Sequence, residues 1–170
     1  MIETMKASSV IEIAEALAES GVRYLIAGGY AVVAHGYARF TADLDLIIQL
    51  ESENIHKTFA TLSRHGYRAS VPVTVEQFSD PDIRSRWIRE KGMQVLNFFH
   101  PQHPQARVDL FVTEPLPFDI ALSRAFWQSV GVGTKLPFVG LDDLIHMKRV
   151  AGRTKDLMDL EYLTKYGRES

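Results

Sequence analysis

The sequence contains no cysteine. This absence excludes disulfides, thiolate nucleophiles, cysteine-bound zinc and iron–sulfur clusters, and it leaves carboxylates and six histidines as the candidate metal ligands. Long apolar runs are also missing, since no stretch approaches the roughly 18 residues that a membrane span needs. The first residues lack the basic-then-apolar order of a secretion signal. We therefore expect a cytoplasmic protein with no membrane partner.

Neither sign of charge dominates the chain. It has 19 Lys and Arg against 21 Asp and Glu, a formal charge of −2, so no global field attracts nucleic acid or an anionic membrane. Of the 170 residues, 46% are hydrophobic, which is enough to fill one sizeable core. No repeat, low-complexity tract or long linker divides the sequence. We expect one domain over residues 1–170.

Hydrophobic periodicity predicts helices that alternate with short strands. The Ser-x-x-Glu spacing from Ser9 to Glu12 is that of a capping box, so the first helix is expected to begin there and to stop at Gly21. Further helices are expected over residues 30–35, 52–64, 118–126, 141–151 and 154–166. Strands are expected over residues 23–27, 43–48, 95–99 and 107–112, with an edge strand over 135–139.

The remaining segments are less regular. Residues 66–92 are expected to hold a β segment, a loop and a short Arg-rich helix. The strands 95–99 and 107–112 are expected to form a hairpin whose prolines prevent continuous pairing. The whole pattern predicts an α/β (α+β) fold, in which helices flank a mixed central sheet and a helical cap follows at residues 141–166.

Gly28 and Gly29 follow the predicted apolar strand 23–27 and precede a short segment rich in Ala and Val. A glycine turn at the start of a helix exposes unpaired backbone N–H groups and the positive end of the helix dipole. Because no side chain stands in the way, such a turn can receive phosphate groups. The glycine pair is therefore a candidate phosphate-binding turn.

Asp43 and Asp45 stand two residues apart in a predicted strand, so their side chains project from one face with backbones about 6.5–7 Å apart. Two carboxylates near a core repel each other unless they are protonated, solvated or neutralised by a cation. Oxygen ligands without thiolates favour the hard ions Mg²⁺ or Mn²⁺, which accompany phosphates. Asp109 interrupts another apolar strand, and if the two strands are neighbours, the three carboxylates can hold two cations.

The glycine pair followed by Asp43-Leu44-Asp45 resembles the signature of the DNA polymerase β-like nucleotidyltransferases, and Asp109 matches their third carboxylate. Residues 28–48 and 141–160 together are similar to the AbiEii-type nucleotidyltransferases of bacterial abortive-infection and toxin–antitoxin systems. The resemblance implies a nucleotidyltransferase fold and transfer of a nucleoside monophosphate from an NTP, with Mg²⁺ or Mn²⁺ as cofactor and pyrophosphate as product. It leaves the acceptor open between RNA, a protein and a small molecule, and it allows an antitoxin partner.

The resemblance also implies roles for single residues. Asp43 and Asp45 would coordinate both metals, and Asp109 would complete one metal site and help to activate the acceptor hydroxyl. The residues implied in nucleotide binding are Gly28, Gly29, Arg39, Thr41 and Lys148, of which Arg39 and Thr41 would order a loop or touch phosphate. The C-terminal residues that match the family's polar helix pattern are Arg153, Lys155, Asp156 and Asp159.

Structural interpretations compete with several of these roles. Arg39 would serve a purely structural end if it paired with Asp43. The stretch from Lys148 to Asp159 would be an ordinary charged helix face if its Lys and Asp residues paired at helical spacing. His35 is expected to be a capping or core histidine rather than a catalytic group.

Other motifs have two interpretations each. His100 and His103 could bind zinc with Asp109, although two histidines in a proline turn more often form only a turn. The basic residues around Trp87 suit contacts with RNA or, more commonly, a solvated helix face; they are Arg84, Arg86, Arg89 and Lys91. Residues 131–135 lack the Walker spacing and are expected to form a bend.

Two other functions fit the same residues. One is a non-catalytic protein on the same fold that binds a nucleotide or a partner chain and acts through association. The other is a metal-dependent phosphohydrolase, because the same carboxylates and ions can direct water at a phosphate. Labelled acceptor is expected from a nucleotidyltransferase, and free phosphate without labelled acceptor from a hydrolase.

Overall fold

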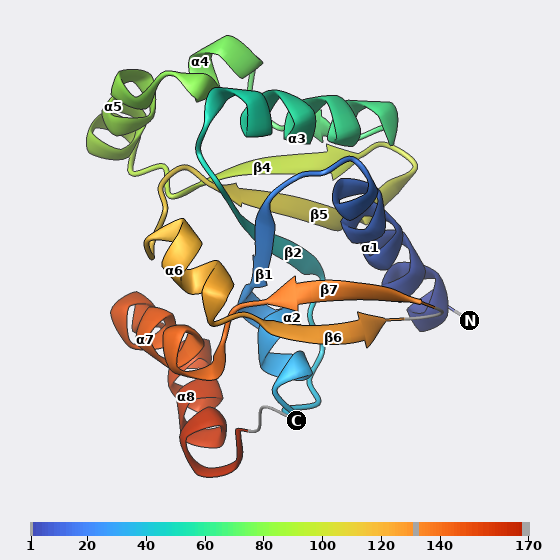
Figure 1. Cartoon of the computed structure of the whole chain (residues 1–170), viewed down its shortest axis with the longest axis vertical. Helices are drawn as coiled ribbons and strands as arrows, with labels where there is room; N and C mark the ends of the chain where they lie inside the picture. Colours follow the sequence, from blue (N-terminus) through green and yellow to red (C-terminus); the bar gives the residue numbers. More distant parts are fainter. Residues whose placement is uncertain (1, 131–132, 168–170) are drawn as a thin grey trace.

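The computed structural model describes residues 2–130 and 133–167 (Figure 1). Its helices are α1 (Ile2–Glu19), α2 (Gly28–Ala34), α3 (Ser52–Arg64), α4 (Val75–Ser79), α5 (Pro81–Lys91), α6 (Phe118–Ser123), α7 (Leu141–Ala151) and α8 (Thr154–Tyr166). Its strands are β1 (Tyr24–Ala27), β2 (Asp43–Ile48), β3 (Arg68–Ala69), β4 (Val95–His100), β5 (His103–Phe111), β6 (Phe126–Val130) and β7 (Thr134–Phe138). No helix in the described part of the chain is both long and apolar enough to cross a membrane.

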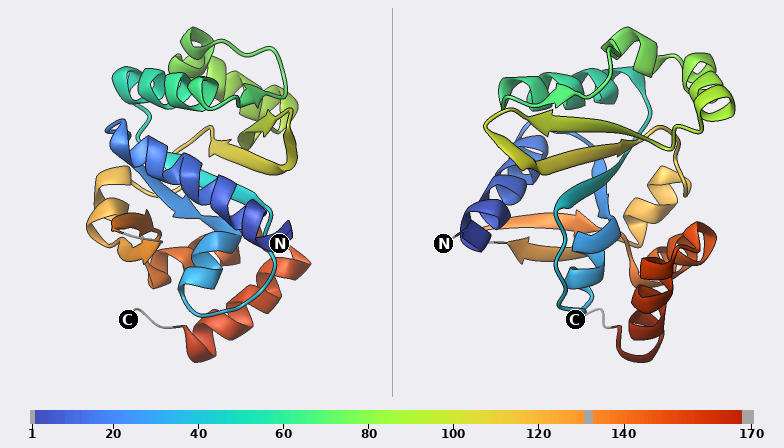
Figure 2. Two further views of the ribbon diagram at one scale, coloured as in Figure 1. Left: turned by 90° about the vertical axis from the view of Figure 1, so that its right-hand side faces the viewer. Right: turned by 180° about the vertical axis from the view of Figure 1, so that it is seen from behind.

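The strands form one mixed sheet of seven strands in the order β3-β4-β5-β2-β1-β7-β6. The pairs β2–β5 and β1–β7 are parallel, and the other neighbours are antiparallel. Helices lie on both sides of this sheet, with α1 on one side and α6, α7 and α8 toward the other (Figures 1 and 2). The predicted α/β fold with a mixed central sheet and C-terminal helices is confirmed.

One face of the β4–β5 part of the sheet is buried and the other is open. In β5, the side chains of Ala106, Val108 and Leu110 are buried, whereas Arg107 is exposed and Asp109 is only half-buried. Helix α1 packs against β5 on the buried side, and α3 joins it through an edge-to-face contact between aromatic rings of α3 and β4. Because side chains alternate along a strand, the polar residues of β5 project from the opposite, open face.

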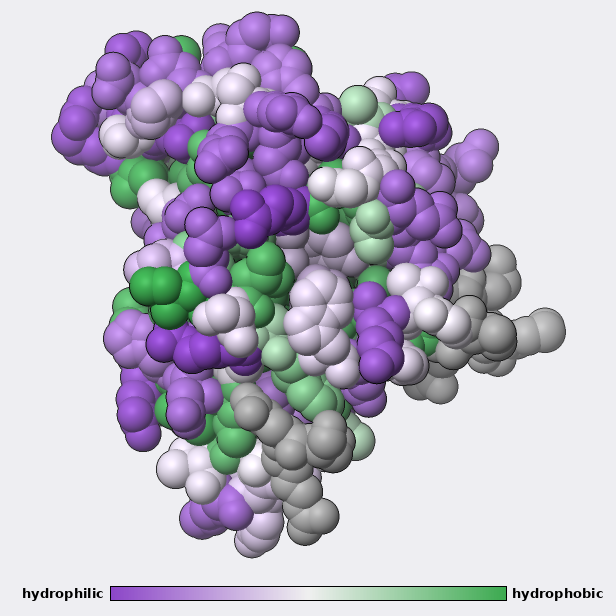
Figure 3. Space-filling model, viewed as in Figure 1, coloured by the Kyte–Doolittle hydropathy of each residue, from purple (hydrophilic) through white to green (hydrophobic). Residues whose placement is uncertain are grey.

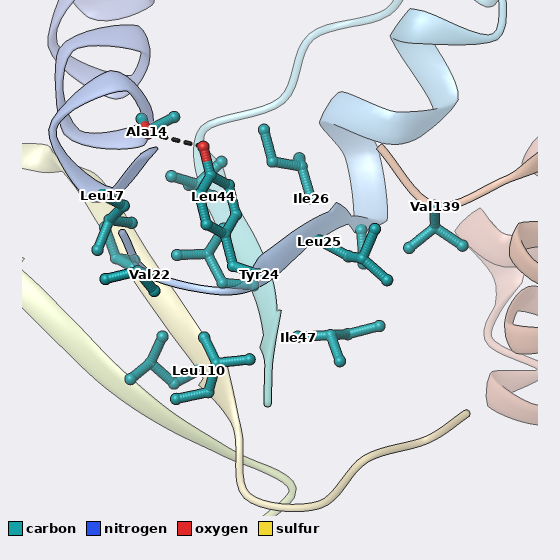
Figure 4. Packing of buried hydrophobic residues seen from close by; sticks show 14 of the residues in the cluster. Ala14, Leu17, Val22, Tyr24, Leu25, Ile26, Leu44, Ile47, Leu110 and Val139 are labelled. Atoms are coloured by element: carbon teal, nitrogen blue, oxygen red, sulfur yellow. Dashed lines mark hydrogen bonds between the residues drawn. The ribbon is translucent and has the colours of Figure 1, made fainter. Parts of the chain in front are cut away.

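The core continues around β1 and β2 (Figure 4). On one side, the Tyr24 hydroxyl donates a hydrogen bond of 2.7 Å to the carbonyl oxygen of Ala14 in α1, next to Leu44. On the other side, Leu25 and Ile47 are direct partners in the antiparallel β1–β2 ladder. The strand β2 lies between β5 and β1 in the sheet. Backbone pairing on both sides therefore fixes the positions of the polar residues at its N-terminal end.

The first helix and the hairpin differ from their predictions. Helix α1 begins at Ile2, so Ser9 lies inside it and the predicted capping box is wrong. The Ser-x-x-Glu spacing also occurs within helices, where the backbone N–H groups already have intrahelical partners. The β4–β5 pairing continues to His100 and His103 through a register irregularity after Phe99, so the prolines do not stop it. An irregularity of this kind accommodates a residue that cannot donate to the ladder.

The segment after α6 also differs. Helix α6 ends at Ser123, and Phe126 belongs to the strand β6, which the periodicity did not predict. The strand β7 lies between β1 and β6, so the predicted edge strand is an inner strand. The bend predicted at residues 131–135 includes residues 131–132, which lie outside the described residues. Elsewhere, the predicted helices 52–64, 141–151 and 154–166 and the strand 43–48 are confirmed.

Candidate active site

Asp45 and Asp109 are direct partners in the parallel ladder between β2 and β5. Asp43 pairs with Arg107 two residues earlier in the same ladder. Residues that are partners in a ladder, or two apart in one strand, project from the same face. The three carboxylates therefore gather on one face of two adjoining strands, as expected if those strands were neighbours. All three side chains are partly buried.

Burial and neighbouring like charges raise the pKa values of Asp45 and Asp109. Burial raises the pKa of Asp45 to about 7, with Asp109 and Asp43 adding like-charge repulsion and Lys148 and Lys155 opposing it. Burial also raises the pKa of Asp109, and the negative charge of Asp43 adds to this effect. The folded chain therefore disfavours full ionisation of these groups unless a cation accompanies them.

Asn97 in β4 is a partner that the sequence analysis missed. Its Nδ2 donates a hydrogen bond of 2.6 Å to Oδ1 of Asp109, and this bond lowers the pKa of Asp109 against the effect of burial. Asn97 and Asp109 are direct partners in the antiparallel β4–β5 ladder. A polar residue on the open side of a strand is common, so only the pairing register could have revealed this contact.

The glycine pair lies against the carboxylate face. Gly28 has φ +61°, and a Cβ placed on it would lie 2.7 Å from Cγ of Asp45. A Cβ on Gly29 would lie 2.7 Å from Cβ of Thr41 and 3.2 Å from Nη1 of Arg39. Both positions therefore exclude larger residues, Gly28 also through its left-handed backbone. The turn from β1 into α2 therefore brings the backbone of the two glycines, which we predicted to bind phosphate, next to the carboxylates.

Arg39 bridges the loop before β2 to the C-terminal helices. Its Nε and Nη2 donate to Oδ1 and Oδ2 of Asp159 in α8, both at 2.8 Å. This fork-shaped ion pair orders the loop, because the planar guanidinium matches the carboxylate with two parallel bonds. The partner is Asp159 and not Asp43, with which the structural interpretation had paired it.

Lys148 and its neighbours form a buried ionic cluster. Nζ of Lys148 lies 3.0 Å from Oδ1 of Asp156 and 2.9 Å from Oδ2 of Asp159. Nε of Arg153 lies 2.7 Å from Oδ2 of Asp156. Burial opposes ionisation of Asp156, but the hydrogen bonds from Arg153 and Lys148 outweigh it and lower the pKa of Asp156 to about 2. These Lys–Asp pairs join α7 to α8 and are buried, so they are not the pairs at helical spacing on a solvated helix face that the structural interpretation predicted.

Lys155 differs from Lys148 in exposure and in partners. It stands in the first turn of α8 with an exposed side chain, and no described residue forms an ion pair with it. Its positive charge lowers the pKa values of both Asp45 and Asp109. Sequence reasoning assigned the triphosphate contact to Lys148 and only a pattern match to Lys155. In the fold, Lys155 is an exposed cation near the carboxylates, without an ion-pair partner among the described residues.

The remaining motifs lie away from the carboxylate face. His35 is buried, and its Nε2 lies 2.8 Å from the carbonyl oxygen of Val139, as expected for a core histidine. Arg84 and Trp87 are buried, and Arg84 donates to the carbonyl oxygen of Phe78, so these members of the basic run serve the core. The other basic residues of the run, Arg86, Arg89 and Lys91, are exposed on α5.

A metal ion would need rearranged side chains at this site. Within residues 2–130 and 133–167, no group of three or more His, Asp or Glu side chains is arranged to hold a metal ion, which includes the zinc set suggested for the histidine turn. The three carboxylates nevertheless fit a hard divalent cation by chemistry, because they are oxygen donors on one face with unfavourable mutual repulsion.

No protein-family model matches this chain, and no curated protein matches it in sequence. Among solved structures, it is similar to the lincosamide antibiotic adenylyltransferase LnuA in its lincomycin-bound form, with 13% identity, a TM-score of 0.58 and coverage of 94% of this chain and 96% of that chain. It is also similar to the antibiotic-resistance factor ANT(2'')-Ia in solution, with 13% identity, a TM-score of 0.59 and coverage of 94% and 83%.

A crystal structure of ANT(2'')-Ia in complex with adenylyl-2''-tobramycin is similar as well, with 12% identity, a TM-score of 0.55 and coverage of 96% of this chain and 88% of that chain. The matched regions extend over nearly the whole chain in each comparison. At this level of identity the similarity concerns the fold. The chain thus shares the fold of these structures, in agreement with the mixed α/β fold that its sequence led us to expect.

Proposed function

We propose that this protein is a Mg²⁺- or Mn²⁺-dependent nucleotidyltransferase that transfers a nucleoside monophosphate from an NTP to an acceptor hydroxyl and releases pyrophosphate. The observation that carries the proposal is the pairing of Asp45 with Asp109 beside the Gly28 turn. The structures with the same fold support it, because one is an antibiotic adenylyltransferase and another holds an adenylylated antibiotic. The carboxylates, the glycine turn and an unpaired cation are the groups that such a transfer needs.

In the proposed reaction, the acceptor oxygen attacks the α-phosphorus and the bond to the β-phosphate oxygen breaks. Asp43, Asp45 and Asp109 would hold the divalent ions, which when bound neutralise charge on the phosphates and on the leaving pyrophosphate. The Gly28-Gly29 turn and Lys155 position the triphosphate. Asp109 is the group we propose to help activate the acceptor hydroxyl, because it lies beside Asp45 in the β2–β5 ladder.

The open face beside the carboxylates favours a phosphate-bearing acceptor. The ladders place Arg68 beside Phe99, Phe99 beside Arg107 and Arg107 beside Asp43. Both arginines are exposed, and no described residue forms an ion pair with either. A ring between two guanidiniums can stack a base and bind phosphates, whereas a cationic acceptor would be repelled. Of the acceptors that the sequence left open, we therefore favour RNA over a protein or a small molecule.

A narrower proposal concerns the biological setting. The similarity of residues 28–48 and 141–160 to AbiEii-type proteins supports a role as the toxic component of a toxin–antitoxin pair, with an antitoxin as partner. Induced expression should then stop growth, and Asp45→Asn should abolish this effect without lowering the amount of folded protein. Growth arrest that persists in the variant would contradict a toxic nucleotidyl transfer.

The proposal is tested with each NTP labelled at the α-phosphate, Mg²⁺ and a mixed pool of RNA and protein. Labelled RNA that disappears with Asp45→Asn or with chelator is the expected result. Mg²⁺-dependent nucleotide binding without any transfer would instead favour the non-catalytic binding protein. Release of phosphate without labelled acceptor would favour the phosphohydrolase.

A further inference from the structure

The strand β6 is an unprotected edge of the sheet. It pairs only with β7, whereas the strand at the other edge, β3, has only two residues. Its sequence, Phe-Trp-Gln-Ser-Val, carries no charge, proline or glycine. Sheets usually protect an edge of this length with charged residues, proline, a bulge or a covering element, because its free backbone groups can pair with another strand. Within the described residues, no backbone hydrogen bond outside the β6–β7 ladder involves β6.

The partner strand fixes which backbone groups of β6 are free. Trp127 lies opposite Pro137 in the antiparallel β6–β7 ladder, and proline has no N–H to donate. In such a ladder, hydrogen-bonded pairs alternate with non-bonded pairs. The pair of Trp127 with Pro137 must be a non-bonded pair, and so must the pair of Ser129 with Lys135. The N–H and C=O groups of Trp127 and Ser129 therefore point away from β7, toward the open edge.

The side chains next to this edge are uncovered as well. Trp127 is 51% exposed and Val33 in α2 is 37% exposed. A cavity of about 340 Å³ opens between α1, α2 and the β6–β7 hairpin, and Gln128 and Val130 from β6 line it together with mostly apolar residues. The surface over β6 and β7 includes apolar and nearly neutral patches, while the surface over α4 and α5 is mainly hydrophilic (Figure 3). The chain thus leaves apolar surface beside free backbone groups.

We propose that β6 pairs with β6 of a second copy of this chain in an antiparallel, two-fold symmetric dimer. In this register Trp127 lies opposite Ser129 of the second copy, and each of these pairs exchanges two backbone hydrogen bonds. Gln128 lies opposite its own counterpart on the symmetry axis. The two Trp127 side chains are diagonal neighbours on one face, within reach of each other. One sheet then runs through both copies.

The observations favour a second copy over a foreign strand. The free groups of Trp127 and Ser129 stand symmetrically about Gln128, so the edge is complementary to itself without any shift in register. It also lacks charge, so two identical edges do not repel each other, and it offers no charge by which a different strand would be selected. The inference does not depend on the proposed enzymatic activity, because none of these residues lies on the carboxylate face.

The decisive variant is Ser129→Pro, tested by light scattering of the purified full chain over a wide range of concentration. Proline removes an N–H that points away from β7, so the intramolecular ladder is kept and only the bonds between copies are lost. We expect wild-type protein to have twice the chain mass of 19.2 kDa and Ser129→Pro to have the mass of one chain. Ser129→Ala keeps the N–H and should remain dimeric.

A second variant keeps the test independent of how well proline is tolerated. Trp127→Lys places two positive charges near each other across the symmetry axis and should also yield single chains with an unchanged circular dichroism spectrum. Wild-type protein that has the mass of one chain at every concentration would overturn the proposal and leave the edge to a strand of another protein. A dimer that persists in both Ser129→Pro and Trp127→Lys would overturn it as well.

Discussion

Asp45 lies directly between a like charge and a glycine: Asp109 is its ladder partner in β5, and Gly28 stands against its carboxylate from α2. This position has two consequences. The carboxylate is buried beside another negative charge, which costs free energy in the absence of a cation. The contact with the glycine turn also means that any change at Gly28 moves the carboxylate.

Replacement of Asp45 by Asn should stabilise the metal-free protein in a pH-dependent way. The pKa of Asp45 is about 7 in the folded chain against an ordinary value of 3.8. The folded chain therefore binds more protons than the unfolded chain between these values, so wild-type stability falls as pH rises from about 4 to about 7 and then stays level. Asp45→Asn removes this loss, which amounts to at most about 4 kcal/mol above pH 7.

Urea unfolding at pH 4 and pH 8 with chelator present measures the difference. The variant should match wild type at pH 4 and exceed it at pH 8. Added Mg²⁺ should raise the melting temperature of wild type at pH 8 and leave that of Asp45→Asn nearly unchanged, because metal binding to the folded state adds to its stability. Equal stability of both proteins at the two pH values would contradict the crowding of like charges.

Substitution of Gly28 by Ala should abolish transfer. The residue has φ +61°, which costs about 1–2 kcal/mol for an L-residue, and its Cβ displaces the carboxylate of Asp45. A displacement of about 1 Å at a reacting centre can reduce kcat about 100-fold. Gly21→Ala is the matched control, since Gly21 has φ +72° and a Cβ there would meet nothing within 4 Å.

Gly21→Ala should show the cost of backbone strain alone, Gly28→Ala should lose more stability because its Cβ also meets Asp45, and only Gly28→Ala should lose transfer activity. Transfer that is reduced equally in both would show that the effect comes from backbone strain alone. Normal transfer by Gly28→Ala would place the phosphates elsewhere than at this turn.

The carboxylates could be located from the sequence because they interrupt apolar strands. A strand that is otherwise buried can carry Asp43, Asp45 or Asp109 only at a site that solvates or neutralises charge, so the interruption itself is informative. The glycine pair was informative for a related reason, since two glycines between a strand and a helix indicate a close approach of other groups. Local patterns were sufficient here because few structural reasons explain an Asp within an apolar strand or two glycines between a strand and a helix.

The remaining features depend on contacts between distant segments. Lys148 and Lys155 look alike in the sequence, and only the packing of α7 on α8 places Lys148 between Asp156 and Asp159. Asn97 gains its role from the register of β4 against β5. The strand β6 escaped prediction because its short run of aromatic and polar residues continues from a helix without a clear break. Tertiary pairing decides these cases, and no local pattern records it.

Replacement of Asn97 by Ala should shift the pH dependence of transfer. The hydrogen bond from Asn97 stabilises the charged form of Asp109, so its loss raises the pKa of Asp109 further. The acidic limb of the profile of kcat/KM against pH should move toward higher pH, because the charged form of Asp109 loses a hydrogen bond that favours it. Activity at alkaline pH should be retained. A uniform loss of activity at every pH would indicate a merely structural role for Asn97.

Replacement by Met should lower stability at Lys148 and weaken NTP binding at Lys155. Lys148 is 5% exposed between two carboxylates, so Lys148→Met leaves buried charge uncompensated and should lower the free energy of unfolding by about 3 kcal/mol. Lys155→Met changes an exposed residue and should alter stability by less than about 0.5 kcal/mol, while raising KM for the NTP about tenfold because a free cation beside the carboxylates is lost. Urea unfolding and initial rates at varied NTP measure both effects. If Lys148→Met folded stably and Lys155→Met bound NTP normally, the triphosphate contact would belong to Lys148, as the family resemblance implies.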